Sequence, residues 1–375
     1  MKPRHDGPGR ADGRAHGIVK RFEWSVGTDA HILTGRKGHV RPEVAAMLRQ
    51  LLLVAICLAA GVQSAAANPD RWQREGWKTD FSKTLISWDE IMSGGPPKDG
   101  IPSIDDPKFI PVSEERELGP KEPVMSLEID GDARAYPLRV LTWHEIVNDR
   151  VGGVPVAVTY CPLCNSGVVF DRRLDGRLLE FGTTGKLRNS DLVMYDRQTE
   201  SWWQQFTGRA IVGHYAGKRL DILPARLESI TDFRERHPEG DVLVPNDPDM
   251  RRYGMNPYTG YDSSTRPLLY RGEMPEGIEP LARVVVVRID PETPVIVGLK
   301  HLRERGPLTF GSVKVTWRPG QNSALDSARI SKGRDVGTVE AVEIAGDGTS
   351  KPVPYDVTFA FVANAFHPDV PIRMN

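Results

Sequence analysis

Cysteine is scarce in this chain, because its 375 residues include only Cys57, Cys161 and Cys164. A framework of several disulfides, on which many small secreted folds depend, is therefore excluded. Long hydrophobic runs are also scarce. The apolar segment 51–62 is too short to span a bilayer, and no second run reaches that length. We therefore expect no stable membrane span in the mature protein.

Motifs of several common enzyme classes are missing as well. The sequence has no Walker A loop, no Gly-x-Ser-x-Gly elbow, no His-Glu-x-x-His motif and no dinucleotide fingerprint between a strand and a helix. Hydrolase and nucleotide-dependent functions therefore lack motif support. Whether the protein is an enzyme stays open at this point.

Residues 47–67 have the three parts of a secretory signal peptide. One basic residue precedes the apolar core at 51–62, and three alanines at 65–67 form a small-residue cleavage site. We therefore expect an exported protein, in the periplasm or outside the cell. Residues 1–46 are polar and lack periodicity, and we interpret them either as sequence upstream of a true start at Met47 or as a disordered extension.

The expected mature chain carries a mild excess of negative charge. Residues 1–67 contain ten Lys and Arg and five Asp and Glu, so 49 − 10 = 39 positive and 50 − 5 = 45 negative side chains remain, a net charge of −6. No basic stripe is left to bind a phosphate backbone. We therefore expect no nucleic-acid partner.

Glycine and proline are plentiful, with 36 and 30 residues, which favours many short strands joined by turns. Turn signals such as Asp130–Gly131 separate short alternating segments. The sequence therefore predicts a mainly β protein, of α+β type with few short helices. We divide it into an irregular lead-in at 68–120, a first β-rich lobe at 121–245, a connector loop at 246–280 and a second, degenerate β-rich lobe at 281–375.

An internal repeat is indicated by two short segments. Val-Thr-Tyr-Cys-Pro-Leu-Cys-Asn-Ser at 158–166 returns as Val-Thr-Trp-Arg-Pro-Gly-Gln-Asn-Ser at 315–323, and 124–130 parallels 284–290. The pattern predicts an internally duplicated β barrel or sandwich, with chance resemblance as the alternative. Because the second copy lacks both cysteines, the scaffold does not need the sulfur atoms, and a chemical role for the pair is favoured.

Several longer motifs occur in a fixed order along the chain. They are residues 99–109, 133–139, 143–149, 159–164, 189–205 and 365–368. In these motifs the chain resembles a family of secreted prokaryotic proteins known as domain of unknown function 3179. The resemblance implies that the motifs form one common unit, and it supplies no established activity.

Three interpretations compete for the Cys161-Pro-Leu-Cys164 segment. A redox pair is the first, although the sequence after Cys164 predicts a turn and a strand where thioredoxin-like sites have a helix. A soft-metal site is the second, since two thiolates at this spacing can hold one ion. A local disulfide that stabilises a turn is the third, and exported proteins often have one.

For a metal site, copper is favoured, because Cu(I) accepts two or three soft ligands. His144 is our first choice for a third ligand, and Met194 and His214 are further candidates. Partners under this hypothesis are a metal ion or a periplasmic thiol protein. A second hypothesis is a non-catalytic extracellular binding module, in which the cysteines form a structural disulfide and Trp202 or Trp203 contacts a small ligand.

Overall fold

The computed structural model describes residues 69–374, which belong to one compact unit. The predicted signal peptide at 47–67 and the segment before it lie outside the described residues. The described part is mainly β, as predicted, and its α-helices have six or seven residues each. These helices are α2 (Pro69–Arg74), α3 (Leu138–His144), α4 (Ile230–Arg236), α5 (Leu299–Arg305) and α6 (Ala360–Phe366). None of the described helices is long and apolar enough to cross a membrane.

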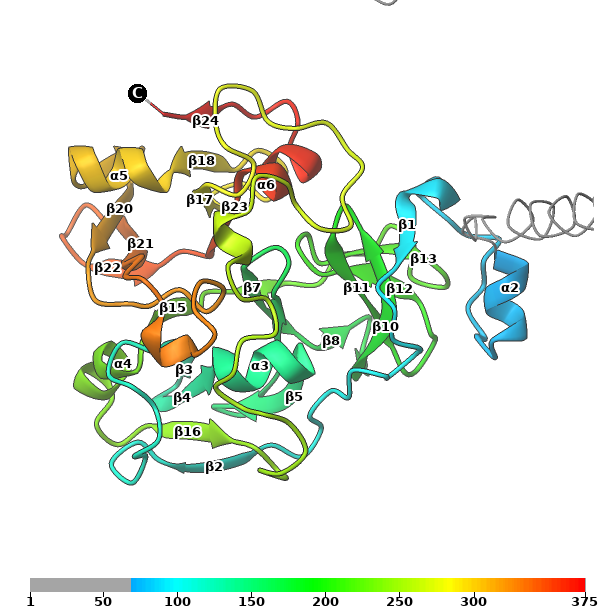
Figure 1. Cartoon of the computed structure of the whole chain (residues 1–375), viewed down its shortest axis with the longest axis horizontal. Coiled ribbons are helices and arrows are strands. Elements are labelled where there is room, and N and C mark those ends of the chain that lie inside the picture. The colour runs from blue at the N-terminus through cyan, green and yellow to red at the C-terminus, as the bar shows by residue number, and fades with distance from the viewer. Residues whose placement is uncertain (1–68, 375) are drawn as a thin grey trace, which may run out of the picture. The chain divides into compact units, whose positions relative to one another are not determined.

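Five sheets of four or five strands are arranged in a ring, like the blades of a propeller (Figure 1). Three of them come from the first part of the chain. The β3 sheet contains β2 (Lys108–Pro111), β3 (Pro123–Ile129), β4 (Asp132–Pro137), β15 (Arg226–Ser229) and β16 (Asp241–Val244). The β6 sheet contains β5 (Ile146–Val151), β6 (Val154–Cys161), β7 (Ser166–Asp171) and β14 (Ile222–Leu223). The β11 sheet contains β1 (Ile91–Ser93), β10 (Phe181–Arg188), β11 (Asp191–Asp196), β12 (Trp202–Gln204) and β13 (Arg209–Val212).

The other two sheets come from the C-terminal part. The β17 sheet contains β17 (Arg283–Val287), β18 (Val295–Gly298), β23 (Tyr355–Phe359) and β24 (Ile372–Arg373). The β20 sheet contains β19 (Leu308–Phe310), β20 (Val313–Arg318), β21 (Thr338–Ile344) and β22 (Ser350–Pro352). A small hairpin, β8 (Arg173–Leu174) and β9 (Arg177–Leu178), completes the strands, and η1 (Trp88–Glu90), η2 (Tyr261–Ser263) and η3 (Ile330–Lys332) are short 3-10 turns.

The order of the elements shows that the fold is duplicated. The series β3–β4–α3–β5–β6–β7 is followed later by β15–α4–β16, and the series β17–β18–α5–β19–β20–β21 by β23–α6–β24. In each copy the last strand lies parallel to the second one, β16 on β4 and β24 on β18. Helices α4 and α6 are also followed alike, by His237 and His367, each with proline after it. The predicted repeat is therefore confirmed, and the β11 sheet is an addition to the first copy.

The two similar sequence segments have corresponding structures only up to the ends of β6 and β20. Across β6 and β7, Cys161 pairs with Ser166, whereas across β20 and β21 Arg318 pairs with Thr338. A longer connection therefore follows β20, and Ser323 is not the sheet counterpart of Ser166. The turn that carries Cys164 in the first copy has no equally short equivalent in the second.

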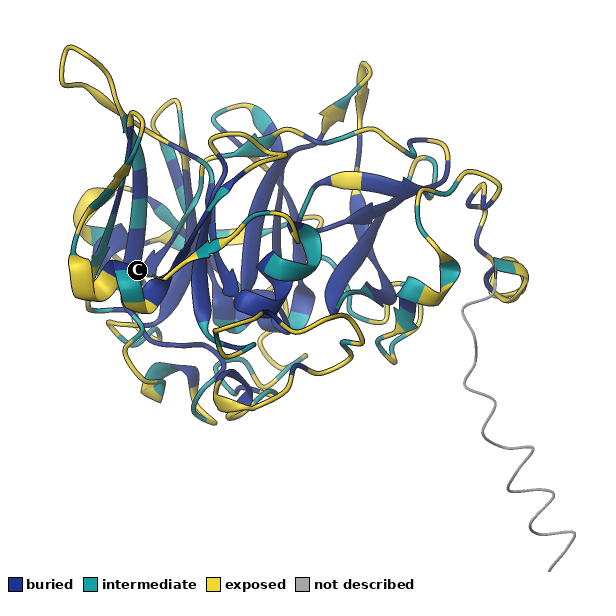
Figure 2. Ribbon diagram, turned by 90° about the horizontal axis from the view of Figure 1, so that it is seen from above, coloured by how far each residue is buried: buried dark blue, intermediate teal, exposed yellow. Residues whose placement is uncertain are grey.

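One hydrophobic core extends through both copies. Figure 2 shows buried residues along the strands and exposed residues mainly in the connections. Trp202 and Trp203 have no exposed surface. The hypothesis that one of these rings lies on a ligand-binding surface is therefore wrong. Adjacent strand residues face opposite sides, but both sides of β12 are covered here.

The lead-in packs against the β11 sheet. Trp72, Trp77 and Phe81 surround the Trp202 ring at centroid distances of 4.8, 5.2 and 5.3 Å. Strand β1 pairs with β10 and strand β2 with β16, so the lead-in adds one edge strand to each of two sheets.

The connector between β16 and β17 contains one short helical turn, η2. Within that turn, Asp262 accepts hydrogen bonds from Arg283, Ser323 and Arg334. Tyr261 donates a hydrogen bond to the Leu163 carbonyl oxygen at 3.0 Å. The connector is therefore joined to both copies, and one of its contacts reaches the turn between the two cysteines.

Candidate metal centre

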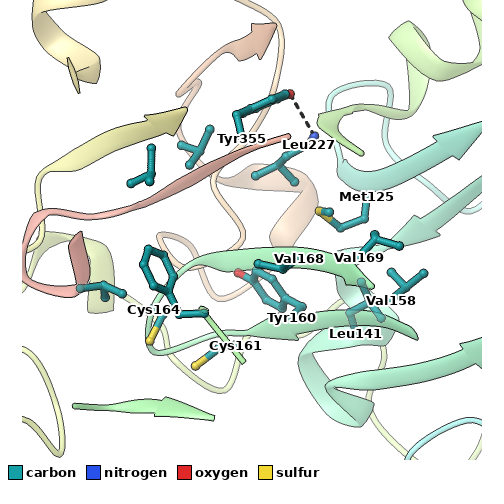
Figure 3. Packing of buried hydrophobic residues seen from close by; sticks show 14 of the residues in the cluster. Met125, Leu141, Val158, Tyr160, Cys161, Cys164, Val168, Val169, Leu227 and Tyr355 are labelled. Carbon is teal, nitrogen blue, oxygen red and sulfur yellow. Dashed lines mark hydrogen bonds between the residues drawn. The ribbon is translucent and has the colours of Figure 1, made fainter. Parts of the chain in front are cut away.

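The two cysteines lie where β6 turns into β7. Cys161 is the last residue of β6, and Cys164 donates a backbone hydrogen bond to the Cys161 carbonyl oxygen at 3.2 Å. Asn165 follows with φ 49°, a left-handed conformation that asparagine tolerates better than most residues. This tight turn brings both side chains to one side of the chain, and Figure 3 shows the two sulfur atoms close together. Strand β7 then begins at Ser166, so no helix follows the pair.

A third potential ligand comes from the neighbouring β11 sheet. Asp191 is the first residue of β11, after a turn in which Asn189 and Ser190 have φ values of 53° and 67°. The Cys161 thiol lies 3.7 Å from the Ser190 carbonyl oxygen, which joins this turn to the cysteines. Ligand atoms of Cys161, Cys164 and Asp191 lie within 4.8 Å of one another, and all three residues are buried. This buried Cys-Cys-Asp group could hold a metal ion.

The two oxygens of the Asp191 carboxyl group differ in their surroundings. Oδ2 accepts hydrogen bonds from Gln204 Nε2 at 2.6 Å and from the Phe206 backbone at 2.9 Å. Oδ1 is buried and accepts no hydrogen bond of good geometry, although the Cys164 thiol is close enough to interact with the carboxyl group. Burial raises the pKa of Asp191 to about 6, and its hydrogen bonds oppose that rise. A buried acceptor without a donor is costly, and a bound cation would remove that cost.

Glu145 is a second acidic residue at this site. It follows α3 directly with φ 59°, and its side chain has no hydrogen bond to any described residue. Burial, and then the charge of Asp191, raise the pKa of Glu145 to about 8. The charge of Asp191 also contributes to the raised pKa of Cys161. Glu145 is therefore close to the group, although it is not one of the three residues within 4.8 Å.

Both cysteines are free thiols in the structure. Their exposures are 2% for Cys161 and 0% for Cys164, and burial raises the pKa of both thiols. A cysteine that exchanges disulfides needs an accessible thiol with a lowered pKa. The surroundings therefore do not favour thiol exchange, and the disulfide of the binding-module hypothesis is not formed here.

The other predicted ligands have different neighbours. His144 Nδ1 lies 2.8 Å from the Pro102 carbonyl oxygen and its Nε2 2.7 Å from Tyr253 Oη, so both ring nitrogens are engaged away from the Cys-Cys-Asp group. Met194 is buried in β11, opposite Trp203. His214 is exposed and packs on Tyr215. The assignment of these residues as ligands stays a prediction.

Sequence reasoning did not select Asp191 or Glu145. From the sequence alone, His144 is the favoured third ligand rather than its neighbour Glu145, and Asp191 has no assigned role. One available signal was that each lies in a motif of the family resemblance next to a predicted strand or helix. Which acid faces the sulfur atoms depends on the packing of β10 and β11 beside β5 and β6, which no local pattern shows.

Fold and site together define a mainly β protein with one ring of five sheets, built from two copies of a repeat, and a buried Cys-Cys-Asp group. Residues 98–370 match the model of the family described as protein of unknown function, DUF3179, and the chain belongs to that family. No curated protein and no solved structure matches the chain. The family resemblance noted from the sequence is thereby confirmed.

Proposed function

We propose that the protein binds one soft or borderline transition-metal ion through Cys161, Cys164 and Asp191. The observation that carries this proposal is the meeting of three ligand atoms within 4.8 Å, one of them from a separate sheet. Ligands around a tetrahedral zinc ion with bonds of about 2.3 Å lie about 3.8 Å apart, so small side-chain movements suffice. The unpartnered Asp191 Oδ1 supports a cation at this position.

The donor set bears on the choice of metal. Two thiolates suit Cu(I), the ion favoured by the sequence, and they also suit zinc. The carboxylate of Asp191 adds a harder ligand, which zinc uses readily and Cu(I) does not need. We therefore propose zinc or a similar divalent ion as the preferred metal, and Cu(I) bound by the two sulfur atoms as the alternative.

The proposed centre has three protein ligands, so a fourth position is available for water or for a ligand. Zinc sites that catalyse reactions commonly have this arrangement, whereas structural zinc sites have four protein ligands. Glu145 is the nearby acidic side chain, and because its pKa is raised to about 8 it is protonated at pH 7 and could donate a proton to a group bound there. This leaves a metal-dependent reaction open and assigns no substrate.

We further propose that the protein is exported, as the signal-like segment 47–67 indicates. An exported cysteine pair becomes oxidised unless a metal or a reductant protects it. Burial of both thiols beside a carboxylate provides a place for such a protecting metal. Fractionation of cells that express the full chain tests this part, with recovery in the cytoplasm as the contradicting result.

Metal content of the full-length chain, purified without chelators, tests the proposal directly. Wild type should contain about one equivalent of metal, and Cys161→Ser, Cys164→Ser and Asp191→Asn should each lose most of it. His144→Gln and Met194→Leu are matched controls, and retention of metal by both would remove them from the ligand set. Circular dichroism checks that each variant is folded.

Two results would reject the metal hypothesis. One is a wild-type protein that stays metal-free after exposure to zinc and to Cu(I). The other is equal metal content in wild type and in the double Cys161→Ser, Cys164→Ser variant. If the thiols instead react rapidly with a disulfide reagent in the folded protein, thiol chemistry with a periplasmic partner takes the place of metal binding.

A further inference from the structure

A groove of about 450 Å³ lies where α6 meets the β11 sheet. Arginines from three segments line it: Arg188 at the end of β10, Arg209 at the start of β13 and Arg219 before β14. Phe366 and His367, at the end of α6, form part of another wall. These two residues belong to the Ala-Phe-His-Pro motif at 365–368, which the metal centre does not use.

The protein's own carboxylate already occupies part of this groove. Arg209 Nη2 and Arg219 Nη1 both donate to Glu292 Oε1, each at 2.7 Å. Glu292 comes from the turn between β17 and β18, and its side chain is 64% exposed. Two arginines that converge on one carboxylate oxygen form a ready anion site. An exposed glutamate on a turn can leave that site at little cost.

Buried polar atoms without partners lie beside this position. His367 is 8% exposed, it lines the groove, and its Nε2 has no hydrogen-bond partner within residues 69–374. Arg288 is buried against the Phe206 ring, and its Nε and Nη1 also lack hydrogen-bond partners in this described part of the chain. Burial and the charge of Arg288 lower the pKa of His367 to about 4, so the ring is neutral at pH 7 and can donate one hydrogen bond.

We propose that this groove binds a small organic carboxylate, which takes the place of the Glu292 carboxylate on Arg209 and Arg219. The volume is within the range of sites for small molecules, about 300–1,000 Å³. Phe366 supplies an apolar wall for the carbon skeleton, and the Arg188 guanidinium lies 5.6 Å from the Phe366 ring centre.

The groove is connected to the Cys-Cys-Asp group by side chains. Arg188 Nη1 donates to Gln204 Oε1 at 3.4 Å, and Gln204 Nε2 donates to Asp191 Oδ2 at 2.6 Å. Two hydrogen bonds therefore join Arg188, on the wall of the groove, to Asp191, and Arg188 is also paired with Glu90. The carboxylate site itself does not depend on a metal, and its test can be performed on metal-free protein.

Calorimetric titration of the full-length protein with succinate tests the site, and inorganic phosphate serves as a second probe. Wild type should bind succinate more tightly than phosphate. Arg219→Gln should weaken succinate binding at least tenfold, because a charged donor is lost. Glu292→Gln should tighten it severalfold, because the internal competitor is removed. Arg303→Gln on α5, which lines a different groove, should leave it unchanged.

The Glu292 variant keeps the test decisive if an arginine variant fails to fold, because tighter binding cannot result from unfolding. Absence of succinate binding by both wild type and Glu292→Gln at millimolar concentrations would overturn the proposal. Equal weakening by Arg219→Gln and Arg303→Gln would do the same. Phosphate binding without succinate binding would overturn the assignment to carboxylates.

Discussion

Asp191 has a buried carboxyl group whose two oxygens have different surroundings. Its Oδ2 has two hydrogen-bond donors, its Oδ1 has no hydrogen-bond partner of good geometry among the described residues, and the carboxyl group lies near the sulfur atoms. A buried carboxyl group of this kind has a folded-state cost, since an unsatisfied buried polar atom costs about 1–3 kcal/mol. Such costs occur at sites that serve a ligand more often than at sites that serve the fold alone.

The Asp191→Asn variant separates these roles. The amide oxygen can still accept the bonds from Gln204 and Phe206, while the amide nitrogen replaces the unpartnered oxygen. We expect metal affinity to fall at least tenfold, and the metal-free variant to be as stable as wild type or up to about 2 kcal/mol more stable. Urea unfolding of chelator-treated proteins measures the second effect, and a large loss of stability would show that the carboxylate serves the fold.

At the same scale, the sequence indicated part of the site and missed the rest. The spacing of Cys161 and Cys164 predicts two neighbouring thiols, because a two-residue spacer in a turn brings both side chains together. Asp191 comes from another sheet, and its position depends on long-range packing. His144 and Glu145 are adjacent in sequence, but the end of α3 between them directs their side chains to different surroundings.

At the scale of single elements, the lead-in depends on its aromatic residues. Helix α2 has six residues and cannot be stable alone. Trp72 is 4% exposed and contacts Phe81 and Trp202. Trp72→Ala should therefore lower the free energy of unfolding by about 3 kcal/mol. Urea unfolding provides the measurement, and Leu85→Ala, at a side chain that is largely exposed, is the control. Similar values for the two variants would contradict the packing argument.

The connector element depends on the charge of Asp262. Burial alone would raise the pKa of this carboxyl group, but Arg283, Ser323 and Arg334 outweigh it, and the pKa is lowered from 3.8. A lowered folded-state pKa adds stability that is fully present above the unfolded value of 3.8. That stability is lost as the pH falls below 3.8 through the lower folded-state pKa.

Asp262→Asn should therefore be less stable than wild type at pH 7, by about 3 kcal/mol, because Arg283 is left buried without its partner. The difference should shrink as the pH is lowered below 3.8. Urea unfolding at pH 7 and at a series of acidic pH values measures it. Asp106→Asn, at an exposed bend, should show almost no difference at any of these pH values. A stability difference between wild type and Asp262→Asn that increases as the pH is lowered would contradict the lowered pKa of Asp262.

At the scale of the whole molecule, local sequence patterns predicted the strands and the repeat better than the arrangement of the sheets. The short strands and the repeat of β6 in β20 follow from alternation, turn residues and direct comparison of segments. The place of the β11 sheet does not, because β14 and β15 rejoin the first copy some fifty residues after β7. The bounds predicted for the two lobes remain predictions, whereas the hydrophobic core is shared by both copies.

A shared core predicts that the two copies unfold together. Leu302 on α5 of the second copy has no exposed surface, and Leu302→Ala should cost about 2–5 kcal/mol. Trp317, in β20, is the one tryptophan of the second copy among the described residues, so in a Trp317→Phe background the fluorescence reports unfolding outside the copy that carries Leu302. If unfolding is cooperative, the midpoint in urea should fall equally by fluorescence and by far-ultraviolet circular dichroism. A circular dichroism transition that moves to lower urea while the fluorescence transition stays in place would show that each copy unfolds on its own. In that case a metal bound at Cys161 and Cys164 would stabilise the first copy alone, whereas cooperative unfolding makes the metal stabilise both.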